Sequence, residues 1–238
     1  MEILENIAEY YDELYPIAKS QREFYAKIAE PFKNPVKFLR IGCGTGAFEH
    51  LLAQEGADVT GTETIDSLLE SANRRRRTQL MSIRFFNMTN LELSRYLGKG
   101  FYNVVSILDG RIMFTSDPVL LEKLFFDCHA LLSDGGRFVV SLPDFDFFSG
   151  EEFSLPTRKS IRASLSSAVR KNKDSYFFEQ LLENGNGKIV TVTRDAKICV
   201  PNRAAFVALS KKAEFSAVEF KKGFDDQTDG ELVAIFSK

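Results

Sequence analysis

The sequence FLRIGCGTGAFEHLLA, residues 38–53, decides the fold that we expect for this chain. The apolar residues at 36–41 predict a short strand, and the glycine-rich run GCGTG follows it at once. Glycine tolerates positive φ and lets a ligand approach the backbone, because it has no side chain. The next residues predict a helix over 47–54, whose first N–H groups are free to bind a ligand. The segment is therefore typical of a strand, a tight turn and a helix that together bind a ligand.

Strand and helix patterns alternate over the first 142 residues. Strands are expected at 36–41, 58–62, 83–86, 102–108 and 137–142, and helices at 2–15, 18–32, 47–54, 66–77 (with Asp66 as its N-cap) and 117–132. The run YNVVSIL is almost continuously apolar, which favours a strand covered on both faces. The alternation predicts a parallel sheet with helices on both sides.

The last third of the chain has a different pattern. Residues 144–175 are polar and are expected to be irregular. Turn residues predict two hairpins, one joining 176–182 to 189–192 and one joining 217–222 to 232–237, with a helix at 201–213 between them. We expect a single domain over residues 1–238.

Composition excludes several classes of protein. A net charge of −2 and a pI of about 5.9 give no global reason to expect binding to nucleic acid or to anionic membranes. The cysteines Cys43, Cys128 and Cys199 are far apart, which argues against a disulfide framework or a zinc site. The acidic N-terminus resembles no signal peptide, and no apolar run approaches the roughly 18 residues of a membrane span. A cytoplasmic location is expected.

Glu63 is the second sign of a ligand site. It ends the second expected strand, 21 residues after Gly42, where an acid can accept hydrogen bonds from both hydroxyls of a ribose. Dinucleotides and S-adenosylmethionine both use this arrangement. The spacing of Gly42, Gly44 and Ala47 also satisfies the dinucleotide pattern GxGxxA. These residues alone leave both cofactor classes open.

Several segments, taken in order, resemble the class I S-adenosylmethionine-dependent methyltransferases of the small-molecule type. They are LRIGCGTGAFEHLLA (39–53), VTGTETIDSLLESAN (59–73), IRFFNMTNL (83–91), YNVVSI (102–107), LLSDGGRFVVSLP (131–143) and the N-terminal YYDELYP (10–16). The resemblance implies an α/β, Rossmann-like three-layer sandwich. Its mostly parallel seven-stranded sheet would end in an antiparallel strand, and a small antiparallel β insertion at 144–200 would cap the acceptor site.

The resemblance also implies S-adenosylmethionine as cofactor and assigns roles by position. The methionine part of the cofactor would lie against Gly42, Cys43 and Gly44, and its ribose would lie against Glu63. Its adenine would lie against Thr64, Ile65, Asn87 and Met88. The sulfonium and the acceptor would lie against Leu108, Asp109 and Gly110, and Tyr11 and Tyr15 would close over the cofactor. Asp109 is the catalytic candidate, as a general base or an orienting residue, from its position alone. We expect the backbone at residues 42–46 to form a corner that no side chain covers, that faces Glu63 and that holds an adenosine.

Two residues depart from the family pattern. Arg40 stands where the family has an acid, and Asn87 stands where it has an aspartate. Asn87 keeps a carbonyl that can accept a hydrogen bond. Arg40 places a positive charge near a cationic cofactor, so it would weaken binding if it pointed into the pocket and change little if it paired elsewhere. A degenerate, non-catalytic cofactor- or partner-binding protein is therefore the second hypothesis. A nicotinamide-dependent oxidoreductase is the third.

The remaining basic residues receive plainer interpretations. Arg111 is expected to form a surface salt bridge, the alternative being contact with an anionic acceptor. The basic stretches 74–77 and 157–173 are interpreted as solvated faces, because no aromatic platform alternates with them. The expected partner is a small-molecule methyl acceptor rather than a nucleic acid. The sequence names neither the acceptor nor the oligomeric state.

Overall fold

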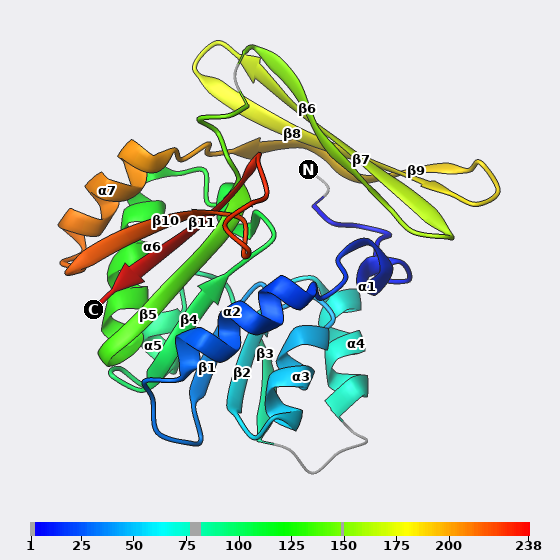
Figure 1. Cartoon of the computed structure of the whole chain (residues 1–238). Coiled ribbons are helices and arrows are strands. Elements are labelled where there is room, and N and C mark those ends of the chain that lie inside the picture. Colours follow the sequence, from blue (N-terminus) through cyan, green and yellow to red (C-terminus); the bar gives the residue numbers. More distant parts are fainter. Residues whose placement is uncertain (1–2, 77–81, 149) are drawn as a thin grey trace.

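A seven-stranded sheet forms the centre of the molecule in the computed structural model, which describes residues 3–76, 82–148 and 150–238 (Figure 1). Its strands lie in the order β10-β11-β5-β4-β1-β2-β3. The strands are β1 (Lys37–Ile41), β2 (Asp58–Glu63), β3 (Ile83–Asn87), β4 (Tyr102–Ile107), β5 (Leu132–Pro143), β10 (Ala217–Lys222) and β11 (Glu231–Ser237). β1 to β5 pair in parallel, whereas β11 is antiparallel to both β5 and β10. The predicted fold class is confirmed.

Helices cover both faces of this sheet, so that the core has three layers (Figure 1). The helices are α1 (Tyr11–Leu14), α2 (Lys19–Ala29), α3 (Ala47–Gln54), α4 (Asp66–Arg76), α5 (Leu93–Tyr96), α6 (Pro118–Leu131) and α7 (Arg203–Lys212). Neighbouring residues of β1 divide between the two faces. Phe38 belongs to the same hydrophobic cluster as Tyr25 of α2 and Phe48 of α3, while Leu39 belongs to the cluster that contains Leu124 of α6. Because both faces are covered, the central strands are apolar at successive positions, as the sequence predicts.

A second, four-stranded antiparallel sheet follows β5 in the chain and lies across the carboxyl ends of the central strands (Figure 1). It consists of β6 (Glu152–Lys159), β7 (Ala163–Asn172), β8 (Ser175–Asn184) and β9 (Ile189–Ile198). The hairpin of β8 and β9 was predicted, but the irregular structure expected at 144–175 is wrong. In β7 the buried apolar side chains are Ala163, Leu165 and Val169, and serines and a partly buried alanine stand between them. Such sparse burial gives little alternation to detect.

The N-terminal segment also differs from its prediction. Of the helix expected at 2–15, the structure describes residues 3–15, and of these only Tyr11–Leu14 is helical, because Leu4 and Asn6 adopt left-handed φ angles of 52° and 55°. The segment instead joins the second sheet, where Glu5 N–H donates to the carbonyl of Val192 at 2.8 Å. Its apolar residues Ile7, Tyr11 and Leu14 are buried, although most of the segment is irregular. At α4 the helix begins at Asp66 itself, so Asp66 is not the residue before the helix as predicted.

Candidate active site

A left-handed turn joins β1 to α3 at the carboxyl edge of the central sheet. Gly42, Gly44 and Gly46 have φ angles of 70°, 60° and 70°, which side chains disfavour. The N–H groups of Gly42 and Cys43 donate to the carbonyl of Thr62 at 2.8 and 2.9 Å. The turn is therefore fixed to the end of β2, and the glycines are required by its backbone conformation.

Gly46→Ala is expected to destabilise the fold strongly. A Cβ at this position would lie 2.5 Å from Cζ of Phe85, in addition to the strain of φ +70°. Overpacking costs about 1–3 kcal/mol and the left-handed conformation about 1–2 kcal/mol, so the free energy of unfolding should fall by roughly 2–5 kcal/mol. Urea denaturation measures this. Gly56→Ala is the matched control, because Gly56 also has a positive φ but no atom lies within 4 Å of its Cβ position. Equal losses in the two variants would contradict the packing argument.

Glu63 points toward this turn from the end of β2. Its Oε2 accepts a hydrogen bond from Gly44 N–H at 2.9 Å. Its Oε1 accepts from the N–H groups of Thr64 and Ile65 at 2.9 and 3.1 Å. The carboxylate is almost fully buried, with 1% of the side chain exposed. The structure thus brings together four of the positions that the sequence assigned to one cofactor site.

The corner at this turn is not bare, contrary to the sequence-based expectation. The ring of Tyr11 covers Gly44 so closely that a Cβ there would lie 2.5 Å from it. The side chain of Arg111 covers Gly42 and reaches Glu63, with 2.8 Å between Nη2 and Oε2. The prediction of a surface salt bridge for Arg111 is also wrong, since only 11% of its side chain is exposed. A buried carboxylate is costly without a partner, and Arg111 supplies the missing charge.

Arg40 points inward as well, between α2 and α3, and is buried. It forms an ion pair with Asp109, with 2.8 Å between Nη2 and Oδ2, and the carboxylate of Glu49 adds a second negative charge nearby. Burial raises the pKa of Glu49 to about 7, although the charge of Arg40 opposes this shift. The two arginines therefore face the carboxylates of Glu49, Glu63 and Asp109, and the positive charge at position 40 is offset within the site.

Asp109 lies at the lip of this site, directly after β4. It has a left-handed φ of 56°, and its N–H donates to Ser141 Oγ at 3.0 Å. One carboxylate oxygen is held by Arg40, which favours an orienting role over that of a general base. Gly110, with φ 72°, then starts the short helical turn Arg111–Phe114 that delivers Arg111 to the corner.

The other predicted residues lie around the same edge. Tyr15 stacks on Tyr11, with ring centroids 4.8 Å apart. Asn87 is the β3 partner of Glu63 in the sheet register, and its amide donates to Asp66 at 3.2 Å. Cys43, Met88 and Leu108 are buried, Met88 among core residues on the α6 side of the sheet. Their proposed contacts with a cofactor stay predictions.

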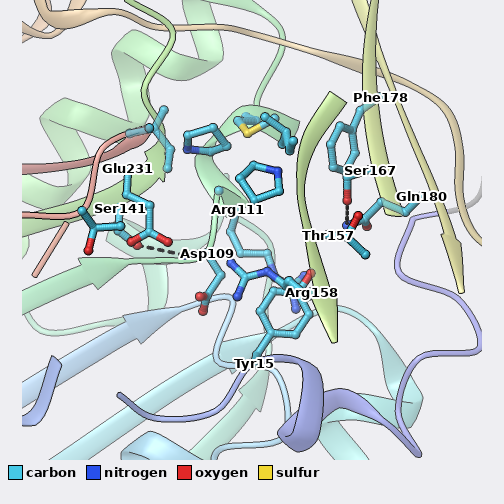
Figure 2. Close-up of a pocket in the computed structure, with 18 of the residues that line it drawn as sticks. Tyr15, Asp109, Arg111, Ser141, Thr157, Arg158, Ser167, Phe178, Gln180 and Glu231 are labelled. Carbon is cyan, nitrogen blue, oxygen red and sulfur yellow. Dashed lines mark hydrogen bonds between the residues drawn. The ribbon is translucent and has the colours of Figure 1, made fainter. Parts of the chain in front are cut away.

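A pocket of about 340 Å³ opens beside the corner, between the central sheet and the second sheet (Figure 2). Of the predicted site residues, Tyr11, Tyr15, Asp109 and Gly110 line it. Apolar walls come from Met113, Phe114, Phe148, Leu155 and Phe178, and polar or charged groups from Arg111, Arg158, Ser167, Gln180, Asp229 and Glu231. The volume and the mixed lining suit a small organic molecule.

Sequence reasoning missed Arg158 and Glu231 as pocket residues. Arg158 lies within the basic stretch that was interpreted as a solvated face, and Glu231 begins the last strand. Pro156, two residues before Arg158, was the available signal, because proline in a strand marks an edge or a bulge. The other basic stretch, 74–77, falls partly outside the described residues.

Two further properties concern only the parts of the chain that the structure describes. Within them, no helix has the length and apolar character needed to span a membrane. The same residues bring together no group of three or more His, Cys, Asp or Glu side chains that could hold a metal ion.

Comparisons with known proteins point to one family. Residues 38–136 match the family model described as a methyltransferase domain. A Geobacillus sp. (strain WCH70) protein named "Putative methyltransferase" is 28% identical over 138 residues, which are 56% of this chain and 54% of that protein. This chain thus spans about half the length of that curated relative.

Solved structures share the whole fold at low sequence identity. The CcbJ methyltransferase from Streptomyces caelestis superposes with a TM-score of 0.80 at 18% identity, covering 98% of this chain and 96% of its own. CalS10 from Micromonospora echinaspora, an amino pentose methyltransferase solved with S-adenosylmethionine bound, has a TM-score of 0.70 at 16% identity, covering 100% and 98%. At these identities the likeness establishes the fold.

Proposed function

We propose that this chain, which carries a class I methyltransferase domain, transfers a methyl group from S-adenosylmethionine to a small-molecule acceptor. The observation that carries the proposal is the glycine turn at the end of β1, fixed to β2 and faced by the carboxylate of Glu63. A pocket that suits a small molecule lies directly beside this corner. The CcbJ methyltransferase and the amino pentose methyltransferase CalS10, which share this fold, agree with such an activity.

The described residues of the corner have the chemistry to hold the cofactor once Arg111 and Tyr11 have moved aside. The backbone of Gly42 to Gly44 would hold its methionine part, and Glu63 would accept hydrogen bonds from its ribose hydroxyls. Thr64, Ile65, Asn87 and Met88 would lie near its adenine. When bound, S-adenosylmethionine supplies an electrophilic methyl group, so the chain need only bring a nucleophile into line and exclude water.

Residues at the lip of the corner would orient the nucleophile and exclude water. Asp109, held by Arg40, would orient the acceptor's nucleophilic atom toward the cofactor. Tyr11 and Tyr15, stacked together, would close over the cofactor from the N-terminal segment. The two arginines face three carboxylates, so the formal charge of these five groups is −1 when Glu49 is ionised. Such a site can accept a sulfonium despite Arg40.

Cofactor entry requires two side chains to move. Arg111 must leave Glu63, and Tyr11 must leave Gly44, since both occupy the space that an adenosine would take. Tyr11 begins α1 and Arg111 begins the short helical turn Arg111–Phe114, so neither side chain comes from a strand of the sheet. We further propose that residues 1–238 act as one domain in which the segment 144–200 caps the acceptor pocket.

The direct test is calorimetric titration with S-adenosylmethionine and with its demethylated product. Dissociation constants in the micromolar range, together with transfer of labelled methyl groups to a small-molecule fraction, would support the proposal. Binding of neither ligand at millimolar concentration would overturn it.

A non-catalytic protein on the same fold is the second candidate, and the filled corner favours it. Arg111 and Tyr11 satisfy the turn and Glu63 without any ligand. Arg111→Met separates the two candidates when the wild type fails to bind. If Arg111 merely competes with the cofactor, the variant gains measurable binding. If the site has been lost, neither protein binds.

A further inference from the structure

The charges that line the acceptor pocket are mostly neutralised by partners outside it. Asp109 is paired with Arg40 and Arg111 with Glu63, each at 2.8 Å. Asp229 is paired with Lys222, also at 2.8 Å. Among the described residues that line the pocket, this leaves Arg158 and Glu231 as the charged groups without an ion pair within 4.0 Å.

Arg158 is directed into the pocket by an irregularity of its strand. β6 is an edge strand of the second sheet, and its register against β7 shifts between Leu155 and Arg158, around Pro156. Proline is tolerated at such edges, and a bulge changes the direction of the side chains that follow it. Figure 2 shows the result, with Arg158 beside Tyr15 at the centre of the pocket.

The guanidinium of Arg158 is held by a ring rather than by a carboxylate. Its Cζ lies 4.3 Å from the centroid of Tyr15, in a cation–π contact. This contact fixes the group and leaves N–H donors at its edge for an incoming ligand. A carboxylate or a phosphate is the partner that this planar set of donors binds best, through two parallel hydrogen bonds.

Glu231 enters the pocket from β11, on the other side from the second sheet (Figure 2). Burial raises its pKa, and the charge of Arg158 opposes this shift. The two groups influence each other without forming a pair, so the space between them is available to a ligand. Repulsion from Glu231 favours binding of an anionic group at the Arg158 side.

We propose that Arg158 recognises an anionic substituent, a carboxylate or a phosphate, on a methyl acceptor whose apolar body packs between Phe148 and Phe178. The identification of the ligand as the methyl acceptor rests on the proposed function, whereas the anion site itself rests on the geometry above. Arg158 is a specificity-determining residue, and the reacting atom of the acceptor would lie on the side of the pocket that Asp109 lines.

Two fluorescent probes of similar shape test the charge recognition. 1-Anilinonaphthalene-8-sulfonate carries an anionic group, and N-phenyl-1-naphthylamine is its uncharged counterpart. Arg158→Met should weaken binding of the anionic probe roughly tenfold or more and leave the uncharged probe within about twofold, because a charge-assisted pair is lost. Glu231→Gln should strengthen binding of the anionic probe severalfold.

Arg170→Met is the matched control, because Arg170 lies on the neighbouring strand β7 and pairs with Asp195 at the surface. It should leave both probes unchanged. Equal binding of the anionic probe to wild type and Arg158→Met would overturn the proposal, and so would a parallel loss of both probes. Displacement by 1-naphthoate and by 1-naphthyl phosphate then shows which anionic group is preferred, and failure of both to displace the probe would also overturn it.

The probe experiment needs neither cofactor nor methyl transfer, so it is independent of the proposed function. Arg158→Met should bind S-adenosylmethionine as the wild type does. If the pocket selects the anionic probe but the protein binds no cofactor, the proposed anion site is supported and the proposed methyltransferase activity is overturned. If the protein binds the cofactor but the pocket does not select the anionic probe, the anion site is overturned and the methyltransferase proposal is supported.

Discussion

Replacing Glu63 with alanine is expected to weaken the binding of S-adenosylmethionine by roughly 10- to 100-fold. Hydrogen bonds to a charged group contribute about 1.5–3 kcal/mol, and 1.4 kcal/mol corresponds to a factor of ten. Glu63 is the carboxylate that faces the glycine turn, through its contact with Gly44 N–H. Calorimetric titration of the variant measures the loss. Glu70→Ala, an exposed change on α4, should leave the affinity unchanged.

The stability of the Glu63 variant must be measured in parallel. Alanine leaves the buried guanidinium of Arg111 without its partner, and breaking a buried ion pair costs about 3–5 kcal/mol. Glu63→Gln keeps the shape and one acceptor, so it serves when the alanine variant fails to fold. It should still lose affinity. A wild-type affinity in Glu63→Gln would mean that the ribose binds elsewhere.

Arg111→Met is expected to strengthen the binding of S-adenosylmethionine, whereas the Glu63 variants weaken it. The variant frees Glu63 and removes a positive charge from a site that must accept a sulfonium. Its affinity for S-adenosylmethionine should rise severalfold, and more than its affinity for the demethylated product, which lacks the sulfonium charge. A fall in both affinities would instead identify Arg111 as a ligand of the cofactor.

The central sheet and the glycine corner could be predicted from the sequence because both leave local signals. β4 is an almost continuous buried run, and the turn after β1 concentrates glycines where the backbone requires positive φ. Glu63 followed from its place at the end of a strand next to that turn. Each of these signals depends on a few neighbouring residues.

The occupants of the corner could not be predicted, because they arrive from distant parts of the chain. Arg111 stands 48 residues from Glu63 along the sequence, and no local pattern links the two. Tyr11 reaches Gly44 only because the segment before it adopts left-handed angles and joins the second sheet. The direction of Arg158 depends on a register shift between two strands. Such features are set by tertiary contacts.

Glu49 should give the stability of this protein an unusual dependence on pH. The side chain lies on α3 beneath the corner and is buried. Among the charged groups that shift its pKa, Arg40 is the cation. Burial raises its pKa from 4.5 to about 7, against the opposing effect of Arg40. Between these two values the folded protein holds a proton that the unfolded chain has released. The contribution of Glu49 to stability is therefore largest below pH 4.5 and is lost as the pH rises toward 7.

Glu49→Gln isolates this effect, because glutamine has a similar shape and does not titrate. Each pKa unit corresponds to about 1.4 kcal/mol, so the variant should gain on the order of 2–3 kcal/mol relative to wild type between pH 5 and pH 8. Urea denaturation of both proteins at the two pH values measures the difference. Glu55→Gln, an exposed change just after α3, should follow the wild-type pH dependence. Parallel curves for wild type and Glu49→Gln would show that Arg40 keeps Glu49 ionised throughout, and the buried charge of the corner would then be independent of pH.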